Sequence, residues 1–343
     1  MSDYSTITSF DNTLSKIIIG DGNRDVLRLI PTGQRVICIT DQNVKLLHPQ
    51  LTNNYETIVI TPGERSKSLA TIEEIIVQLL DKGADRQTFL LGVGGGVVCD
   101  ITGFTASIFM RGVKFGFVAT TLLAQVDAAI GGKNGVDVKG FKNMAGVFRQ
   151  PEFVICDSSI LRTLPDREFK SGMAEIIKSA IIADKKLMNI CRQWEYGSMD
   201  NNLLEDIISR AIAVKTKIVQ ADEKESGLRK VLNLGHSFGH AIEKCSSEVL
   251  HGEAVSIGMC YAADIATDIG ICSPETRDEI CRTISILGLP TDSNISKQAI
   301  FEAMHTDKKH SNQTIDLILP QTIGHCTIEK VSFGKLKQLM KID

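Results

Sequence analysis

Short apolar segments alternate with amphipathic segments in the first half of the chain. Runs rich in β-branched residues occur at 35–40 (RVICIT), 56–60 (ETIVI) and 88–93 (TFLLGV). Between the last two runs, the segment TIEEIIVQLLDKG has apolar residues at helical spacing. Strands that alternate with helices in this way are typical of a parallel sheet with crossover helices. The pattern predicts a Rossmann-like domain at residues 1–157.

The second half has a different pattern. From about residue 158 the apolar positions recur at spacings of three and four, in the segments 166–194, 203–222 and 237–245. The segment TIDLILP at 314–320 is the clearest exception and is expected to be extended. The predicted fold class is therefore an α/β Rossmann-like parallel-sheet domain, followed at 158–343 by a mainly α-helical domain.

Composition limits the classes of function. The chain has 343 residues and a net charge of -3, which argues against a nucleic-acid partner bound by a broad basic surface. Its nine cysteines include no C-x-x-C pair, so neither a disulfide framework nor a thiolate zinc site is expected. The first 20 residues lack the pattern of a signal peptide, and no apolar run reaches the ~20 residues of a membrane span. We expect a cytoplasmic protein without a membrane partner.

A glycine-rich turn follows the third predicted strand. The strand is expected to end at Gly92, and Gly94, Gly95 and Gly96 form a turn before a helix. Such a turn can bring backbone N–H groups to a phosphate at a helix start. The spacing G-x-G-G-G differs from the dinucleotide fingerprint G-x-G-x-x-G, and a tight turn that needs glycine for positive φ or close packing is an equal alternative.

Polar residues follow other predicted strands. Asp41 follows RVICIT and could accept hydrogen bonds from ribose hydroxyls, although a capping role is also open. The loop PGERSKS after 56–60 carries Glu64 and Lys67, and Thr120 and Thr121 follow the strand FGFVA. Because parallel strands end at one edge of a sheet, these residues favour a nucleotide site there.

Histidines and a glutamate form a candidate metal site. His236 and His240 are four residues apart and share one face of a predicted helix, and His251 follows within the same region. Glu175 lies three residues before Lys178 on another helix. A catalytic zinc usually takes three such N or O ligands. For each histidine a core or surface role is the alternative, and for Glu175 an ordinary ion pair with Lys178. The second position of H-E-x-x-H is not glutamate here, which disfavours a metalloprotease.

Together these motifs resemble the 3-dehydroquinate synthase family, within the sugar phosphate cyclase superfamily. The resemblance runs from Asp41 to Pro320 and includes PGERSKS, GGGVVCDITGF, TTLLAQVDAAIGGK, KNMAGVF, GMAEIIK, DEKESGLRKVLNLGHSFGHAIE and LHGEAV in order. So many segments in the same order are not expected by chance. Two departures stand out, Asn134 where threonine is usual and Phe141 where glycine is usual, and both lie in the loop expected from Asn134 to Asn143.

The resemblance implies the site residues and cofactors. The metal ligands would be Glu175, His236 and His251, with zinc as the metal and cobalt as an alternative. NAD contacts would come from Asp41, Glu64, Lys67, Gly95, Gly96, Val97, Asp100, Thr120, Thr121, Lys133, Lys142, Thr163, Leu164 and Glu168. Substrate contacts would come from Asp127, Lys133, Asn143, Lys178, Lys215, Arg229, Asn233, His240 and one of Lys308 and Lys309. Arg111 matches a position that reaches into a neighbouring subunit, which implies a homodimer.

The resemblance also implies the reaction. The small-molecule partner would be a sugar-acid phosphate, 3-deoxy-D-arabino-heptulosonate 7-phosphate, converted to 3-dehydroquinate by transient oxidation with NAD, phosphate elimination, reduction and aldol closure. The lysines and arginine at motif positions suit such an anion, although a solvated surface position is the alternative for each. The alternative functions are another sugar phosphate cyclase, such as 2-deoxy-scyllo-inosose synthase, and a metal-dependent polyol dehydrogenase like glycerol dehydrogenase.

Overall fold

Two compact units make up the chain in its computed structural model, which describes residues 5–10, 13–20, 26–194, 201–306 and 314–342. Unit 1 comprises residues 1–165 and 201–212, and unit 2 comprises residues 166–200 and 213–343. Helix α8 (Asn201–Ala221) contributes its first part to unit 1 and its second part to unit 2. The domain limits 1–157 and 158–343 stay a prediction.

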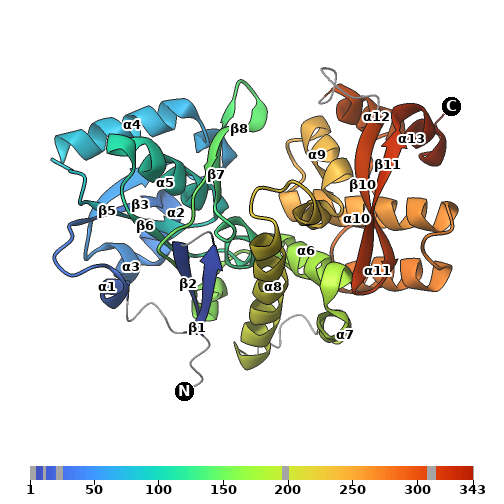
Figure 1. Cartoon of the computed structure of the whole chain (residues 1–343), viewed down its shortest axis with the longest axis horizontal. Coiled ribbons are helices and arrows are strands. Elements are labelled where there is room, and N and C mark those ends of the chain that lie inside the picture. Colours follow the sequence, from blue (N-terminus) through green and yellow to red (C-terminus); the bar gives the residue numbers. More distant parts are fainter. Residues whose placement is uncertain (1–4, 11–12, 21–25, 195–200, 307–313, 343) are drawn as a thin grey trace. The chain divides into compact units, whose positions relative to one another are not determined.

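A seven-stranded sheet forms the centre of unit 1 (Figure 1). Its order is β1 (Ser5–Phe10), β2 (Thr13–Ile19), β9 (Phe153–Cys156), β6 (Phe115–Ala119), β5 (Phe89–Gly94), β3 (Val36–Asp41) and β4 (Glu56–Ile60). All neighbours are parallel except β1 and β2, which are antiparallel. The predicted α/β fold class is confirmed, although β1 and β2 were not among the predicted strands.

Helices cover both faces of this sheet because the chain reverses direction along it. Going from β3 to β4 the chain moves one way, and from β4 to β5 to β6 it moves the other way. Right-handed crossovers then place α2 (Gln42–Leu47) and α3 (Pro49–Thr52) on one face, and α4 (Leu69–Asp81) and α5 (Gly96–Ile108) on the other (Figure 1). A short helix, α1 (Val26–Leu29), precedes β3.

The central strands β5, β6 and β9 are buried on both faces, which explains the continuous apolar runs in their sequences. All six residues of β5 are buried. On one face the rings of Phe89 and Phe153 stack with centroids 5.7 Å apart. Gly116 of β6 makes room for the second ring, because a Cβ there would lie 2.7 Å from a Phe153 ring carbon.

One side chain supports the sheet where its backbone pairing is short. Strands β6 and β9 pair only through Phe117 with Val154 and Val118 with Ile155. Beyond these pairs, the buried Gln125 in the π-helix η4 (Ala124–Ala128) donates from Nε2 to the carbonyls of Ala119 and Asp157 at 3.0 and 2.9 Å. The glutamine amide therefore bridges the last residue of β6 and the residue that follows β9.

A β-hairpin replaces the loop expected between Asn134 and Asn143. It consists of β7 (Lys133–Val138) and β8 (Phe141–Phe148), joined at Lys139 and Gly140, which both have positive φ. Two central residues with positive φ are typical of a tight hairpin turn. The prediction missed β8 because its side chains are mostly exposed and show no apolar alternation.

Short 3-10 helices also lie beside these elements in the described part of unit 1. They are η2 (Glu64–Ser66), η3 (Phe109–Arg111) and η5 (Ser158–Thr163), all in unit 1.

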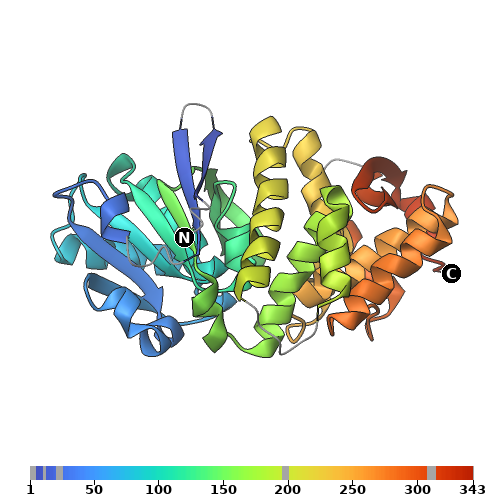
Figure 2. The same ribbon diagram turned by 90° about the horizontal axis from the view of Figure 1, so that it is seen from below.

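Unit 2 is a helical unit with one small antiparallel sheet (Figures 1 and 2). Its helices are α6 (Asp166–Ala183), α7 (Lys185–Arg192), the second part of α8, η6 (Leu228–Asn233), α9 (His236–Cys245), α10 (His251–Asp268), α11 (Pro274–Ile286), α12 (Lys297–Thr306) and α13 (Phe333–Leu339). The sheet pairs β10 (Thr314–Thr322) with β11 (His325–Ser332). The expected strand at 314–320 is thus present, but it is not the only extended segment, because β11 pairs with it.

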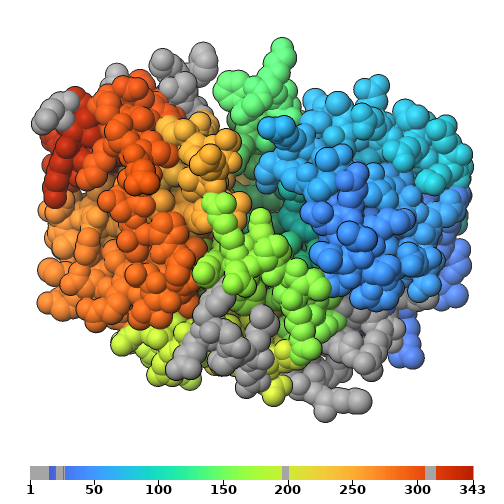
Figure 3. Space-filling model, turned by 180° about the vertical axis from the view of Figure 1, so that it is seen from behind, coloured from blue at the N-terminus to red at the C-terminus, as the bar shows by residue number. Residues whose placement is uncertain are grey.

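Helix α10 is the centre of unit 2. It is buried on nearly all sides and packs against α6, α9, α11 and β10. Helix α11 buries only one stripe, and the orange segment that contains it forms much of the surface of unit 2 in Figure 3. Among the described residues, no helix is both long enough and apolar enough to cross a membrane.

Candidate metal centre and nucleotide site

Three side chains from three helices of unit 2 meet at one point. Glu175 lies in the buried middle of α6, His236 is the first residue of α9, and His251 is the first residue of α10. One potential ligand atom from each lies within 4.8 Å of the others. Oε1 of Glu175 is 3.6 Å from Nε2 of His236 and 3.5 Å from Nε2 of His251. Glu175 lies 61 positions before His236 in the sequence, so helix packing brings together residues that are distant in the chain.

Glycines allow these helices to approach so closely. A Cβ on Gly252 would lie 2.0 Å from the carbonyl oxygen of Ser171 on α6, and Ser171 Oγ accepts from the N–H of Gly252. A Cβ on Gly258 would lie 2.0 Å from the carbonyl oxygen of Gly235. Gly235 itself caps α9 with a φ of 79°, which favours glycine. Larger residues at these positions would push His251 away from Glu175 or His236.

An ion pair supports the start of α10. Arg167 donates to both carboxylate oxygens of Glu253, at 2.6 and 2.7 Å, and to the carbonyl of Glu248. Glu253 in turn accepts from the N–H of Leu250 at 2.9 Å. These bonds hold the segment that leads into His251.

Both imidazoles point the same ring nitrogen at Glu175. Nδ1 of His236 lies 3.1 Å from the carbonyl oxygen of Leu234, and Nδ1 of His251 lies 3.4 Å from Oε1 of Glu243. A carbonyl or a carboxylate can only accept, so both Nδ1 atoms carry the hydrogen. The Nε2 atoms therefore face Oε1 of Glu175 and are the nitrogens that could bind a metal ion.

Burial and neighbouring charges shift the pKa values of all three side chains. Burial alone would raise the pKa of Glu175, but Lys178 and the two imidazoles hold it well below its ordinary value. Lys178 pairs with Oε2 of Glu175, and both side chains are almost fully buried. Burial, and then Lys178, lower the pKa of His236 to about 3. Burial would lower the pKa of His251 as well, but the carboxylates of Glu175 and Glu243 on either side of its ring raise it to about 9, so a metal ion would bind Nε2 in place of a proton.

The three side chains fit a divalent metal ion. Oε1 of Glu175 is buried, and its distances to the two Nε2 atoms are too long for good hydrogen bonds. Two ligand atoms that each lie about 2.1 Å from a tetrahedral zinc are about 3.4 Å apart, close to these distances. One carboxylate and two imidazoles are also a common donor set for catalytic zinc.

Other predicted substrate residues of unit 2 are buried cations. Lys178, Lys215 and Arg229 are 2%, 8% and 2% exposed, which contradicts a solvated surface position for them. Charged side chains are rarely buried to this extent without a functional or structural reason. His240 lies beside the three ligands, with its ring centroid 5.4 Å from that of His236 and 6.3 Å from that of His251.

A carboxylate organises the loop that carries Arg229. Asp222 accepts from the N–H groups of Ser226, Gly227 and Arg229 at 2.9, 2.7 and 3.0 Å. These bonds hold the pKa of Asp222 well below its ordinary value. Further along, Asn233 donates to Glu225 at 2.6 Å. The loop is thus ordered by its own side chains, which sequence reasoning about Arg229 and Asn233 did not reveal.

In unit 1, predicted NAD residues gather at the carboxyl edge of the sheet. The strand order reverses between β3 and β5, and ligands of such sheets bind at this switch point. Asp41 ends β3 on one side of it, and Gly95 and Gly96 begin α5 on the other. Asp41 also caps α2 by accepting from the N–H of Val44 at 2.9 Å.

The glycine turn owes its composition to close packing. Strand β5 continues through Gly94, two residues beyond the predicted end at Gly92, because Val93 pairs with Thr40 and Gly94 with Ala119. Gly94, Gly95 and Gly96 all have negative or extended backbone angles. A Cβ would lie 2.5 Å from Val98 at Gly94 and 3.0 Å from Thr121 at Gly95. Close packing, and not a positive φ, is therefore the reason why glycine is needed at Gly94 and Gly95.

Polar residues surround this turn. Lys67 is buried and pairs with Asp100 of α5 at 2.5 Å. Burial would lower the pKa of Lys67, but Asp100 and then Glu64 raise it. Thr121 accepts from the N–H of Ala124 at 3.1 Å. Three more predicted residues lie here, namely Val97 in the first turn of α5, the buried Thr120 after β6, and the half-buried Asp127 in η4.

The hairpin carries three further predicted residues. Lys133, Lys142 and Asn143 are all exposed, and Asn143 has a φ of 54° and donates its N–H to Asp137 at 2.7 Å. Asn134 is buried and donates to the carbonyls of Gly132 and Arg149 at 2.9 and 2.8 Å. The asparagine that departs from the family pattern therefore holds the base of the hairpin, whereas Phe141 is exposed at its tip.

The remaining predicted residues lie apart from these groups in the chain. Thr163 bonds to Nε2 of His48 at 2.7 Å, and Leu164 follows η5. Glu168 is exposed in the first turn of α6, which belongs to unit 2. Arg111 is exposed with a φ of 69°. Lys308 and Lys309 lie outside the described residues.

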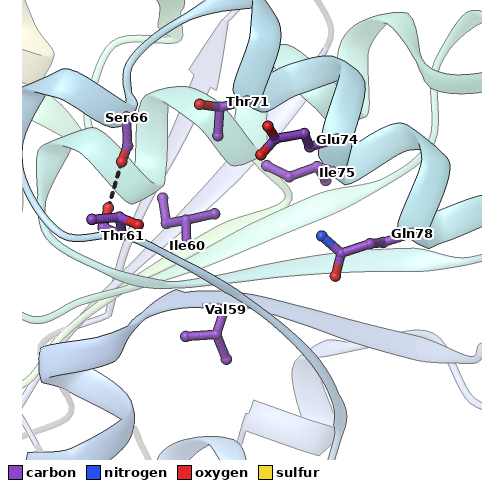
Figure 4. A pocket seen from close by; sticks show the side chains of 8 residues that line it. All are labelled: Val59, Ile60, Thr61, Ser66, Thr71, Glu74, Ile75 and Gln78. Carbon is purple, nitrogen blue, oxygen red and sulfur yellow. Dashed lines mark hydrogen bonds between the residues drawn. The ribbon is translucent and has the colours of Figure 1, made fainter.

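A cavity of about 130 Å³ lies between α4 and β4 in unit 1, lined by Thr71, Glu74 and Gln78 and by strand residues such as Ile60 (Figure 4). It is much smaller than the roughly 300 Å³ or more of a typical ligand pocket. It contains none of the predicted NAD residues. We assign it no role in binding NAD.

Two family models together match residues 57–310, which is 254 of the 343 residues. The model described as 3-dehydroquinate synthase N-terminal matches residues 57–171, and the model described as 3-dehydroquinate synthase C-terminal matches residues 172–310.

Named relatives agree with these models. The chain is 44% identical over 272 residues to a 3-dehydroquinate synthase of Campylobacter fetus, covering 78% of each chain. It is 38% identical over 341 residues to one of Sulfurovum sp., covering 95% of this chain and 96% of the relative.

Solved structures share the fold. A 2-deoxy-scyllo-inosose synthase complexed with carbaglucose-6-phosphate, NAD+ and Co2+ matches with a TM-score of 0.86 and 23% identity, over 98% of this chain and 99% of the other. A 2-epi-5-epi-valiolone synthase from Streptomyces hygroscopicus with NAD+ and Zn2+ bound matches with a TM-score of 0.87 and 24% identity, over 98% of each chain. At these identities the likeness concerns the fold.

Proposed function

The chain belongs to the 3-dehydroquinate synthase family, and from this we propose that it converts 3-deoxy-D-arabino-heptulosonate 7-phosphate to 3-dehydroquinate and phosphate, with NAD and a divalent metal ion. The function predicted from the sequence, that of a 3-dehydroquinate synthase, is confirmed by the family models and by relatives that match most of the chain. The dependence on NAD and on zinc, with cobalt as an alternative, is our proposal.

The observation that carries the metal proposal is the meeting of Glu175, His236 and His251. These residues would hold the metal ion through one carboxylate oxygen and two Nε2 atoms. When bound, the metal would lower the pKa of a substrate hydroxyl, and NAD would take up a hydride and return it. Lys178 neutralises part of the charge of Glu175, which limits the cost of burying the carboxylate.

Other residues of unit 2 would bind the anionic substrate. Lys215 and Arg229 are buried cations, and a guanidinium or ammonium group suits a carboxylate or phosphate. Asn233 would donate to a substrate oxygen, and His240, beside the metal ligands, would contact a substrate hydroxyl. We assign no protein group as the base for phosphate loss, because the substrate phosphate can itself accept the proton.

Residues of unit 1 would bind NAD. Asp41 would accept from ribose hydroxyls, and the backbone N–H groups at the start of α5 would bind the pyrophosphate. The two relatives in fold, whose structures contain NAD+, support this proposal by analogy. The other predicted contacts, from the PGERSKS loop, Thr120 and Thr121, the hairpin, and Thr163 to Glu168, are proposed on the family pattern. Arg111 and a homodimer are proposed on the same ground.

The test is a product analysis with purified protein. We expect that the protein, supplied with the heptulosonate phosphate, NAD and zinc, releases phosphate and forms 3-dehydroquinate in equal amounts without accumulating NADH. Steady NADH formation from glycerol, without phosphate release, would instead support a polyol dehydrogenase. Turnover of a hexose phosphate in place of the heptulosonate would support another sugar phosphate cyclase.

A further inference from the structure

We propose that Glu243 on α9 is a positioning residue of the metal centre, which orients the imidazole of His251 and fixes the tautomer that offers Nε2 to the metal. This inference rests on the proposed metal-dependent function and extends it beyond the three ligands. Glu243 was not among the residues predicted from the sequence.

The geometry of α9 places Glu243 on the face that carries the histidines. His236, His240 and Glu243 are at positions i, i+4 and i+7, so their side chains lie along one side of the helix. Although Glu243 is on the partly accessible side of α9, its side chain is only 7% exposed. A glutamate is rarely buried to this extent unless its carboxylate has a partner.

That partner is a ring nitrogen of His251. Oε1 of Glu243 lies 3.4 Å from Nδ1 of His251, and the opposite nitrogen, Nε2, lies 3.5 Å from Oε1 of Glu175. The imidazole thus lies between two carboxylates from two different helices. One carboxylate is a proposed ligand of the metal, and the other lies behind the ring.

A comparison of the two ligand histidines shows why a side chain is needed here. The Nδ1 atom of His236 is held by the carbonyl of Leu234, two residues earlier in the chain. His251 begins α10, and a carboxylate from a neighbouring helix takes the same role. His236 is therefore oriented by its own backbone, whereas the orientation of His251 depends on Glu243.

The tautomer follows from the chemistry of the acceptor. An ionised carboxylate accepts but does not donate, so Nδ1 of His251 carries the hydrogen and Nε2 keeps its lone pair. Without an acceptor at Nδ1 the hydrogen could lie on Nε2, and that nitrogen could not bind a metal. Carboxylates behind metal-binding histidines commonly have this role and also increase the basicity of the ligand.

Charge provides a second contribution. The carboxylate of Glu175 is shared with the ammonium group of Lys178. In a buried site a divalent cation gains from further negative charge nearby, because screening by water is weak there. Glu243 supplies that charge one imidazole away from the ion.

The experiment compares variants of the full chain for binding of Co2+. We would measure the dissociation constant of Co2+ by competition with a chelator, and record the visible absorption spectrum of the bound ion. Glu243→Leu is expected to weaken binding by about 100-fold and to change the spectrum, and Glu243→Gln, which keeps an acceptor oxygen, by about tenfold. The matched control is Asp292→Asn, which alters a carboxylate of unit 2 that accepts from Tyr261 at 2.7 Å. This control is expected to bind Co2+ like the unaltered chain.

The outcomes separate this inference from the proposed function. If the unaltered chain binds Co2+ and both Glu243 variants, folded by circular dichroism, bind it within about twofold of that affinity with the same spectrum, the positioning role is rejected and the metal centre stands. If the unaltered chain binds no Co2+, the metal centre itself is rejected. Should Glu243→Leu not fold, the result for the near-isosteric Glu243→Gln decides.

Discussion

The two proposed binding regions are built in different ways. In unit 1 the candidate nucleotide site consists largely of backbone, at the carboxyl ends of parallel strands and the start of α5. In unit 2 the candidate metal centre consists of side chains from α6, α9 and α10, of which Glu175 is buried and the two histidines are partly buried. A site made of backbone depends on the strand order, and many residues share the contacts. A site made of three side chains depends on each of them and on how closely their helices pack.

The largest loss of activity and stability should follow from removing one metal ligand. We expect Glu175→Gln to reduce the turnover rate by about 1000-fold or more, because a bound metal contributes several kcal/mol to catalysis. The variant should also lose about 3 kcal/mol of unfolding free energy, since it leaves the buried Lys178 without its carboxylate. Steady-state kinetics and urea unfolding measure the two effects.

A second variant separates stability from chemistry in this prediction. Glu175→Gln combined with Lys178→Met removes the uncompensated charge, so most of the stability should return while metal binding stays lost. Turnover within about tenfold of the original rate in Glu175→Gln would contradict the proposed ligand.

Glycine substitutions compare the packing of the two regions. Gly252→Ala should cost about 3 kcal/mol and weaken metal binding, because its Cβ would lie 2.0 Å from the backbone of Ser171. Gly95→Ala should cost about 1 kcal/mol, since its Cβ would meet a Thr121 side-chain carbon at 3.0 Å. Thermal unfolding and Co2+ titration of the two variants are the measurements. Equal losses for both would mean that helix approach is no more critical in unit 2 than in unit 1.

A milder change tests the nucleotide region. Asp41→Ala should cost about 1 kcal/mol of stability, because the N-cap of α2 is lost. It should also weaken NAD binding by about tenfold if the carboxylate accepts from the ribose. Asp41→Asn keeps a capping oxygen, so it should retain the stability and lose only NAD affinity, as measured by calorimetric titration. A normal affinity in both variants would leave Asp41 with a capping role alone.

The smallest effect is expected at the loop that carries Arg229. The pKa of Asp222 is lowered in the folded chain by three backbone N–H groups, so its stabilisation is present above the ordinary value of 3.8 and is lost as the pH falls below it. Asp222→Asn should therefore lower the stability slightly near neutral pH, and this loss should shrink as the pH falls, so that the acid dependence of unfolding is reduced. The effect is small because water competes at this exposed group. Unfolding curves between about pH 3 and pH 7 check this. If the stability of Asp222→Asn falls with decreasing pH as steeply as that of the unaltered chain, other carboxylates dominate the acid dependence.

Regular patterns made unit 1 predictable. The strands β3 to β6 are apolar β-branched runs of the expected length, and the glycine turn lies where the strand order reverses. The hairpin was missed because Phe141, Met144 and Phe148 are exposed, so no buried face marks β8. The two reasons considered for the glycines could be separated only with Val98 and Thr121 in place, because close packing is a tertiary property.

In unit 2 the residue types were predictable, but their surroundings were not. The spacing of His236 and His240 indicates a shared helix face, yet it says nothing about which residue of another helix faces them. The burial of Lys178 and Arg229 is decided by packing between helices, so the sequence left a solvated surface position open as the alternative for each. Glu243 continues the i, i+4 spacing to i+7, a signal in the sequence that becomes meaningful only when α10 is beside it.

The hydrogen bonds of the Gln125 amide also affect Asp127, which lies two residues further along the chain. The amide continues the short pairing of β6 and β9 through its two hydrogen bonds. The π-helix η4 is therefore fixed to both strands and cannot move without breaking these bonds. Asp127 lies in that same helix. Asp127, which is proposed to contact the substrate, is therefore held as firmly as the central sheet, although it belongs to an irregular segment.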